Sequence, residues 1–177
     1  MRLVIDANIA QSAGNSEISS SRCCRECLNA VLEHEHTAVF SQPLREEWRN
    51  HSSLYARRWW RSMSARRRIE FLEGAEFAIH LDRACACLPH NRWKEDLRKD
   101  FHLVQSALAS DQTILSNEQD FPRYVATACG TVRVLSNLYY ASPQIEQDRC
   151  IAWIEAGAEK HANRRIDAWA LNHLAGD

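Results

Sequence analysis

Acidic residues stand at two positions along the chain where a carboxylate could take part in catalysis. Asp6 directly follows the apolar residues 3–5, and Glu118 and Asp120 follow the short apolar run at 114–115. In an open α/β sheet, ligands bind outside the carboxyl ends of the strands, where residues that follow neighbouring strands gather. We therefore expect Asp6 to lie near Glu118, with Asp120 as an alternative to Glu118.

Helical periodicity singles out two further acids. If residues 43–51 are helical, Glu47 lies on the apolar face and Glu46 is rotated away from it. Asp100 begins a second apolar stripe, which continues through Leu103, Val104, Ala107 and Leu108. A carboxylate turned toward a core is costly unless it is paired, hydrogen-bonded or bound to a metal. An arginine partner for Glu47 and a helix N-cap role for Asp100 are the structural alternatives.

A cluster of carboxylates with few cations nearby favours a hard divalent cation. Mg²⁺ and Mn²⁺ prefer oxygen ligands. Such an ion lowers the pKa of a bound water and neutralises charge on a phosphoryl oxygen, and phosphodiester hydrolysis needs both effects. We therefore predict a Mg²⁺ or Mn²⁺ site for phosphodiester hydrolysis, with a 5′-phosphate and a 3′-hydroxyl as products, formed by Asp6, Glu47, Asp100, Glu118 and Asp120.

An arginine-rich segment occupies residues 57–68, where Trp59 and Trp60 interrupt the basic residues. A guanidinium group suits phosphate and stacks on bases, so the segment indicates nucleic-acid binding. The chain as a whole has a net charge of −1, and a solvated helical face is the alternative interpretation. The predicted nucleic-acid contacts are Arg57, Arg58, Arg61, Arg66, Arg67 and Arg68.

Other side chains with catalytic or metal-binding potential are interpreted as structural. The seven cysteines include a C-x-x-C spacing at 24–27, but Cys24 and Cys27 share a helical stripe with apolar residues and have no suitable second pair. They are therefore expected in the core. His102 lies two residues past Asp100, off the face of that carboxylate, which favours a surface or structural role.

Alternating strands and helices must position these residues. Apolar runs predict strands at 2–5, 37–41, 113–116 and within 131–141. Helical patterns cover 22–35, 43–51, 54–73 with a break near 62–65, 101–109, and one or two helices within 145–174. Residues 75–81 are ambiguous, and 82–99 favour a short helix or loop. The alternation predicts an α/β sheet with parallel pairing.

The length of 177 residues suits a single domain, 1–177, with a core over about 1–143 and a helical extension over about 144–177. No apolar run approaches the roughly 20 residues that cross a bilayer, so no membrane partner is expected. The start has no signal-peptide pattern, which favours a cytoplasmic location.

Four segments together resemble the PIN-domain family of metal-dependent ribonucleases. They are Val4–Asn8, Ser41–Trp48, Lys99–Ala109 and Ile114–Phe121, in the order and at the separations found in that family. The resemblance implies a three-layer α/β/α fold with a central, mainly parallel sheet and extra helices at 54–73 and at the C-terminus. It also implies cleavage of RNA that depends on Mg²⁺ or Mn²⁺.

Carried over by position, the resemblance makes Asp6, Glu47 and Asp100 the principal metal-site acids. It implies that Ser116 steadies Asp6 by hydrogen bonding, with Asn8 in a similar role. The family usually has aspartate where this chain has Glu118, so Asp120 remains a candidate for the fourth acid.

Several alternative functions remain open. A PIN-like domain can bind RNA or a protein without cutting, and it can also be a toxin whose antitoxin protein covers the acids. The chain is longer than the smallest toxin-type members, which weakens the second alternative. A homodimer is a further expectation. A phosphatase with Asp6 as its nucleophile is disfavoured, because Asn8 stands where a second aspartate would be needed.

Overall fold

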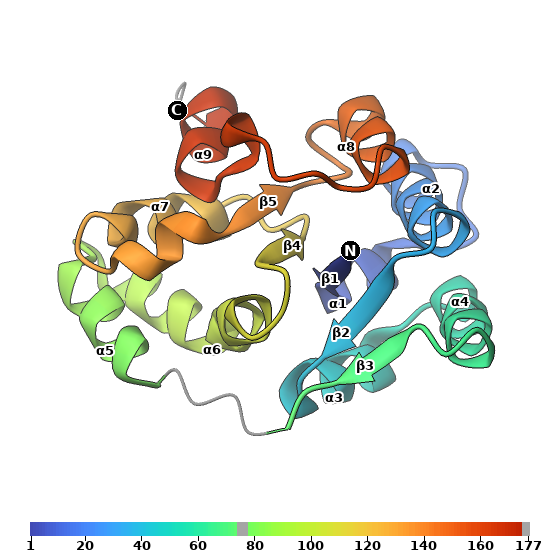
Figure 1. Ribbon diagram of the computed structural model, residues 1–177, viewed down its shortest axis with the longest axis horizontal. Coiled ribbons are helices and arrows are strands. Elements are labelled where there is room, and N and C mark those ends of the chain that lie inside the picture. The colour runs from blue at the N-terminus through green and yellow to red at the C-terminus, as the bar shows by residue number, and fades with distance from the viewer. Residues whose placement is uncertain (74–77, 175–177) are drawn as a thin grey trace.

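The computed structural model describes residues 1–73 and 78–174, which form an α/β fold around a five-stranded sheet (Figure 1). All strand pairs are parallel, and the order is β3-β2-β1-β4-β5. The strands are β1 (Arg2–Ile5), β2 (Thr37–Phe40), β3 (Ile69–Phe71), β4 (Thr113–Leu115) and β5 (Tyr139–Ala141).

Helices cover both faces of this sheet, so the predicted three-layer α/β/α arrangement is confirmed. Figure 1 shows α2, α4 and α8 on one side and α5, α6 and α7 on the other. The α-helices are α1 (Ala7–Ser12), α2 (Ser19–Glu33), α3 (Gln42–His51), α4 (Leu54–Ala65), α5 (Ala78–Cys87), α6 (Asn91–Leu108), α7 (Phe121–Cys129), α8 (Gln147–Glu155) and α9 (Ile166–Leu174).

The strand order reverses direction at β1, which pairs with β2 on one side and with β4 on the other. The chain moves outward from β1 to β3 and then crosses back to β4. Such a reversal opens a crevice at the carboxyl ends of the two central strands, where α/β proteins bind ligands. Asp6 follows β1 and Ser116 follows β4, so both residues stand at this reversal point.

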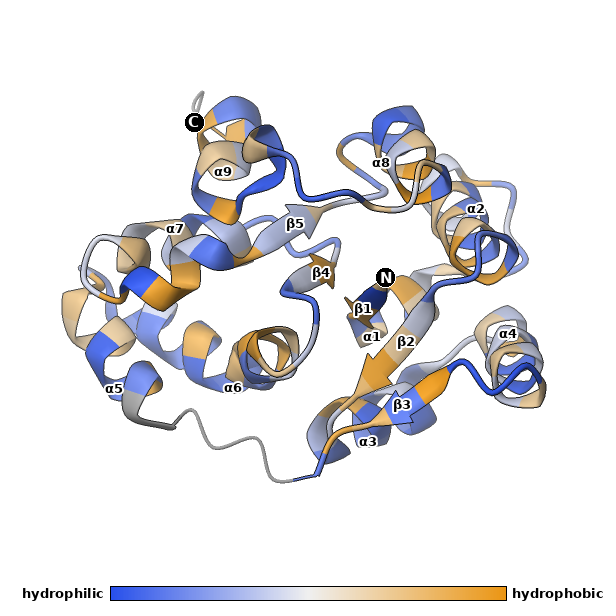
Figure 2. Cartoon of the chain, in the orientation of Figure 1, coloured by the Kyte–Doolittle hydropathy of each residue, from blue (hydrophilic) through white to orange (hydrophobic). Residues whose placement is uncertain are grey.

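The central strands form because their apolar residues are continuous rather than alternating. Residues 3–5, 38–40 and 113–115 are buried throughout, as expected for parallel strands covered on both faces. Figure 2 shows hydrophobic colouring on β1, β2 and β4. On α2, Cys24, Cys27 and their apolar neighbours are buried in the same core, which confirms the structural interpretation of these thiols.

The prediction of a helix across 54–73 is wrong beyond Ala65. Helix α4 ends there, Arg67 adopts a positive φ of 57°, and β3 then pairs with β2 in parallel. A non-glycine residue with positive φ cannot continue an α-helix. The edge strand is short and follows four basic or small residues, so its β pattern does not stand out from the sequence.

The segment 82–99 is also more helical than the sequence indicated. Residues 82–87 belong to α5, and α6 starts at Asn91 and runs through Asp100 to Leu108. The helix predicted at 101–109 is therefore the second half of a longer one. The ambiguous segment 75–81 lies outside the described residues up to 77, and its remaining part begins α5.

The predicted helical extension beyond residue 143 packs against helices on both faces of the sheet. Helix α8 contacts α2, and α9 contacts α7 and β5. Buried Glu146 joins these parts, because it accepts hydrogen bonds from the Arg164 guanidinium and, at 2.7 Å, from the Trp169 indole. Among the helices described, none combines the length and the apolar character that a membrane crossing needs.

Candidate functional site

The carboxylate of Asp6 is held by the backbone and by a strand-end hydroxyl. Its Oδ1 accepts a hydrogen bond from the Asn8 amide at 3.1 Å, and its Oδ2 accepts one from the Ser116 hydroxyl at 2.7 Å. The Asn8 side chain donates to the Ser116 oxygen at 3.1 Å, and so does the backbone N–H of Glu118 at 3.0 Å. Ser116 therefore has both acceptor positions filled and its single proton directed at Asp6.

The turn after β4 is fixed from its other side. The buried Tyr140 hydroxyl lies 3.0 Å from the Ser116 carbonyl and 2.9 Å from the Glu118 carbonyl. The Asn117 backbone N–H donates to the Asn8 side-chain oxygen at 3.2 Å, which ties this turn to the start of α1. The positions of Asp6 and Glu118 therefore depend on a single hydrogen-bonded unit formed by the ends of β1, β4 and β5.

Glu47 reaches the same edge because α3 is anchored to the end of β1. The indole of buried Trp48 donates a hydrogen bond of 2.8 Å to the carbonyl of Ile5, the residue before Asp6. The Glu47 carboxylate then lies 3.3 Å from Nε2 of His102. Among the described residues Glu47 has no arginine partner, so the arginine alternative for this carboxylate is wrong.

His102 lies in the interior, so of the two expected roles, surface or structural, the surface role is excluded. The residue is 8% exposed, and its Nδ1 lies 3.0 Å from the Lys99 carbonyl, so Nδ1 carries a proton. Its Nε2 is buried without a hydrogen-bond partner, although it faces Glu47. Helical periodicity places His102 off the face of α6 that carries Asp100. Periodicity does not show how wide a face of α6 packs against the site.

Asp100 lies in the middle of α6, so it is not the N-cap of that helix. Burial is the main cause that raises the pKa of Asp100 to about 6, and the charges of Asp6 and Glu118 raise it further. The ammonium of Lys99, 3.8 Å away, opposes this shift. The hydroxyl of Tyr124 lies 3.4 Å from the second carboxylate oxygen.

Glu118 and Asp120 differ in their surroundings. Burial raises the pKa of Glu118, and the nearby charge of Asp6 is the next largest cause. Asp120 lies 3.7 Å from the Arg123 guanidinium, at the start of α7. Glu118 is therefore electrostatically linked to Asp6, whereas Asp120 has a cation beside it.

The structure thus brings four acids from four separate segments into one electrostatic group. Burial raises the pKa of Asp6 most strongly, and the charge of Glu47 adds to that effect. Asp6 in turn raises the pKa values of Asp100 and Glu118. Asp6 is the member that links the other three.

These acids have suitable donor chemistry for a hard cation but no closed ligand geometry. Their oxygens are the ligands that Mg²⁺ and Mn²⁺ prefer. Within residues 1–73 and 78–174, no three acidic, histidine or cysteine side chains converge closely enough to hold a metal ion as they stand. The unpartnered Nε2 of His102 is a further polar group beside Glu47.

Of the six predicted nucleic-acid arginines, two line a pocket between α3 and α4. Arg57 and Arg61 on α4 line a pocket with residues of α3, whereas Arg58, Arg66 and Arg67 lie outside it. Arg66 donates to the Leu32 carbonyl, and Arg68 forms an ion pair of 2.8 Å with Glu35. Trp59 is buried and donates to the carbonyl of Leu28, so of the two tryptophans only Trp60 reaches the pocket.

Comparisons of the chain with protein-family models, with curated proteins and with solved structures gave no match. The function therefore has to be argued from the side chains themselves.

Proposed function

We propose that this protein is a cytoplasmic endoribonuclease that hydrolyses RNA phosphodiester bonds with Mg²⁺ or Mn²⁺. The observation that carries the proposal is the assembly at the reversal point of the sheet. There, the Ser116 hydroxyl holds Asp6 by a hydrogen bond. Asp6 interacts electrostatically with Asp100, Glu118 and Glu47, and Glu47 lies beside His102. The resemblance to PIN-domain nucleases supports the same assignment.

The four acids Asp6, Glu47, Asp100 and Glu118 would hold the cation. When bound, the cation lowers the pKa of a water and stabilises charge on a phosphoryl oxygen. Ser116 orients one oxygen of Asp6, and by donating a hydrogen bond to the charged form it opposes the rise that burial causes in the pKa of Asp6. Because Nδ1 of His102 donates to the Lys99 carbonyl, Nε2 is the ring atom that faces Glu47, at 3.3 Å.

Cleavage of a labelled single-stranded RNA tests this function. We expect the wild-type protein to cleave the RNA in Mg²⁺ but not in EDTA. The variant Asp6→Asn should be inactive under both conditions. Asp148→Asn is the matched control, because Asp148 is exposed on α8 and has no partner among the described side chains. Equal cleavage by the wild type and Asp6→Asn, with and without the metal, would exclude the mechanism.

The open spacing of the carboxylates favours a second candidate, a PIN-like module that binds RNA or a protein partner without cutting it. Calorimetric titration with Mn²⁺ separates the two functions. A nuclease should bind the ion in the wild type and lose that binding in Asp6→Asn, whereas a non-catalytic module need not bind it at all.

A further inference from the structure

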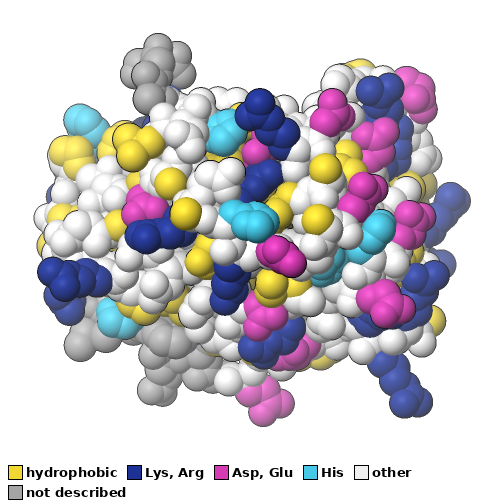
Figure 3. Space-filling model, turned by 45° about the horizontal axis from the view of Figure 1, so that its top comes forward, with side chains coloured by type: hydrophobic (Ala, Val, Ile, Leu, Met, Phe, Trp, Pro, Cys, Tyr) yellow, Lys and Arg dark blue, Asp and Glu magenta, His cyan; other side chains and the backbone are white. Residues whose placement is uncertain are grey.

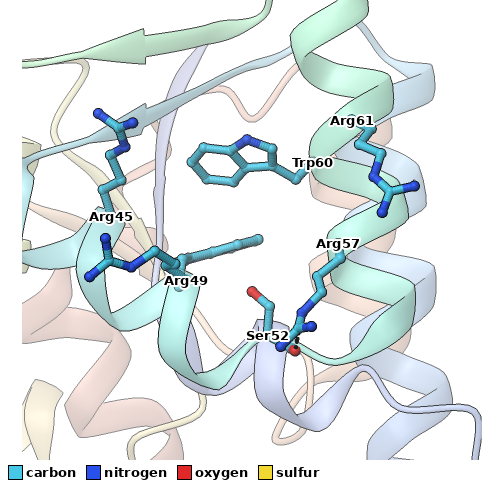
Figure 4. A pocket seen from close by; sticks show the side chains of 7 residues that line it. Arg45, Arg49, Ser52, Arg57, Trp60 and Arg61 are labelled. Atoms are coloured by element: carbon cyan, nitrogen blue, oxygen red, sulfur yellow. Dashed lines mark hydrogen bonds between the residues drawn. The ribbon is translucent and has the colours of Figure 1, made fainter.

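A cavity of about 460 Å³ lies between α3 and α4, and none of the candidate acids lines it. Four arginines line it, two from each helix, together with two tryptophans and one serine: Arg45, Arg49, Arg57, Arg61, Trp48, Trp60 and Ser52. Figure 4 shows the indole of Trp60 between the arginines of α3 and those of α4. We call this cavity the arginine pocket.

The positive charge of the arginine pocket is not balanced by the protein. No acidic residue lines it, and none of its four arginines has an ion-pair partner within the described part of the chain. Arg57 donates to the Ser52 carbonyl, and Arg45 lies over the Phe71 ring at 4.7 Å. By contrast, acidic and basic side chains are interspersed on the face seen in Figure 3. Guanidinium groups remain charged, so their convergence favours an anion.

Trp60 adds an aromatic surface that is held in place from behind. Its ring centroid lies 4.5 Å from that of Phe40 and 5.7 Å from that of buried Trp48. Trp60 itself is only partly buried, so one part of the indole remains open to the cavity. A fixed aromatic ring beside arginines suits a nucleobase stacked next to its phosphates.

A second hollow of about 780 Å³ adjoins this pocket, and its lining includes Glu46 and Glu73. The two cavities share Arg45 and Arg49. The second hollow also reaches Ser41, which follows β2, and His102, the partner of Glu47. A chain of nucleotides lying in both hollows would therefore extend from His102, next to Glu47, to Trp60.

We propose that the arginine pocket binds a single-stranded part of the nucleic acid that the carboxylates cut, with phosphates on the arginines and a base on Trp60. The identity of the polymer rests on the proposed function. A single strand is required because bases within a duplex are already stacked on each other and cannot reach the indole. The pocket thus selects unpaired substrate at a distance from the scissile bond.

Binding without catalysis tests the pocket independently of the nuclease assignment. The probe is a short fluorescein-labelled oligouridylate, followed by fluorescence anisotropy in EDTA over a range of salt concentrations. Arg49→Gln combined with Arg61→Gln should lower the slope of log affinity against log salt by about 0.7 for each phosphate that the variant no longer neutralises. Neither side chain has a partner among the described residues, so both changes should leave the fold intact.

The matched control combines Arg133→Gln with Arg149→Gln, which removes the same charge from exposed positions outside the pocket. This control should keep the wild-type slope. Trp60→Leu, checked for folding by circular dichroism, should weaken binding roughly 5- to 150-fold, the factor that corresponds to removing one stacked base. The arginine variants keep the test decisive if Trp60→Leu unfolds.

Three results would overturn the proposal: pocket and control variants with equal salt slopes, duplex RNA bound as tightly as the single strand, or polyglutamate as an equally effective competitor. Asp6→Asn should bind the probe as the wild type does. If binding depends on the pocket residues but the wild-type protein does not cleave RNA, the nuclease assignment fails, whereas the proposal that the pocket binds a single strand is supported. An oligothymidylate arm shows whether the strand must be RNA.

Discussion

Ser116 is buried at the end of β4, and its hydroxyl connects three segments of the chain. It donates to Asp6 and accepts from Asn8 and from the backbone of Glu118. Without this hydroxyl, each of these partners would lack its hydrogen bond in a region that water reaches poorly. A buried polar group without a partner costs about 1–3 kcal/mol, so the effect of this residue should exceed that of an ordinary serine.

Ser116→Ala should therefore lower the free energy of unfolding by roughly 1–3 kcal/mol and reduce cleavage. The activity falls because Asp6 loses the hydrogen bond that favours its ionised form and fixes its orientation. Urea unfolding and a cleavage assay provide the measurements. Ser62→Ala is the control, since the Ser62 hydroxyl contacts only the carbonyl of Arg58 in its own helix. Equal free energies of unfolding and equal cleavage in Ser116→Ala and Ser62→Ala would contradict this role of Ser116.

Asp100 should destabilise the metal-free protein at neutral pH. Its folded pKa of about 6 lies above the ordinary aspartate value of 3.8, so the folded state favours the protonated form. The stabilising contribution of this group is complete below its unfolded pKa and is lost as the pH rises through about 6.

Asp100→Asn should consequently be more stable than the wild type at pH 7 in EDTA, by roughly 2 kcal/mol. Near pH 4 the difference should nearly vanish, because both side chains are then mostly neutral in the folded protein. Urea unfolding at the two pH values measures this change. A wild-type protein as stable as the variant at neutral pH would show that the carboxylate is not strained by its neighbours.

At the scale of elements, the sequence predicted those parts of the fold whose signal is local. The strands β1, β2 and β4 are continuous apolar runs, and the face of α3 that carries Glu47 follows from its period. Strand β3 was missed because its formation depends on pairing with β2 rather than on its own residues. The start of α6 was missed because polar residues dominate its first turns.

The anchoring of α3 gives a prediction at this scale. Trp48→Phe should lower the free energy of unfolding by about 1–3 kcal/mol, because the buried Ile5 carbonyl loses the indole hydrogen bond. It should also reduce cleavage, since Glu47 is the neighbouring residue on the same helix. Trp93→Phe is the control, because the Trp93 indole N–H has no hydrogen bond in the described structure. Thermal unfolding and a cleavage assay provide the measurements. Equal stability and equal cleavage in Trp48→Phe and Trp93→Phe would show that the Trp48 hydrogen bond does not position Glu47.

At the scale of the whole molecule, the candidate site depends on contacts that periodicity cannot predict. Sequence reasoning selected Asp6, Glu47 and Asp100, but it did not place His102 beside Glu47, and it assigned the nucleic-acid contacts to a single arginine segment. The arginine pocket draws half of its arginines from α3, and only the packing of α3 beside α4 brings them together. Such groupings become visible in the folded chain alone.

The buried ion pair of Glu146 and Arg164 connects the start of α8 with the segment that precedes α9. Glu146→Gln should lower the free energy of unfolding by roughly 3–5 kcal/mol, because the Arg164 charge is left without a counter-ion. Glu155→Gln, at an exposed position on α8, should have little effect. Melting temperatures of the two variants compare them directly, and similar values would argue against a stabilising role for this ion pair.

The hydrogen bond between Asp6 and Ser116 joins residues 110 positions apart. During translation, Asp6 leaves the ribosome 110 residues before Ser116 does. A growing chain therefore carries no assembled acid cluster next to the messenger that encodes it. Parallel pairing of the first strand with the fourth delays the onset of any activity until synthesis has passed β4.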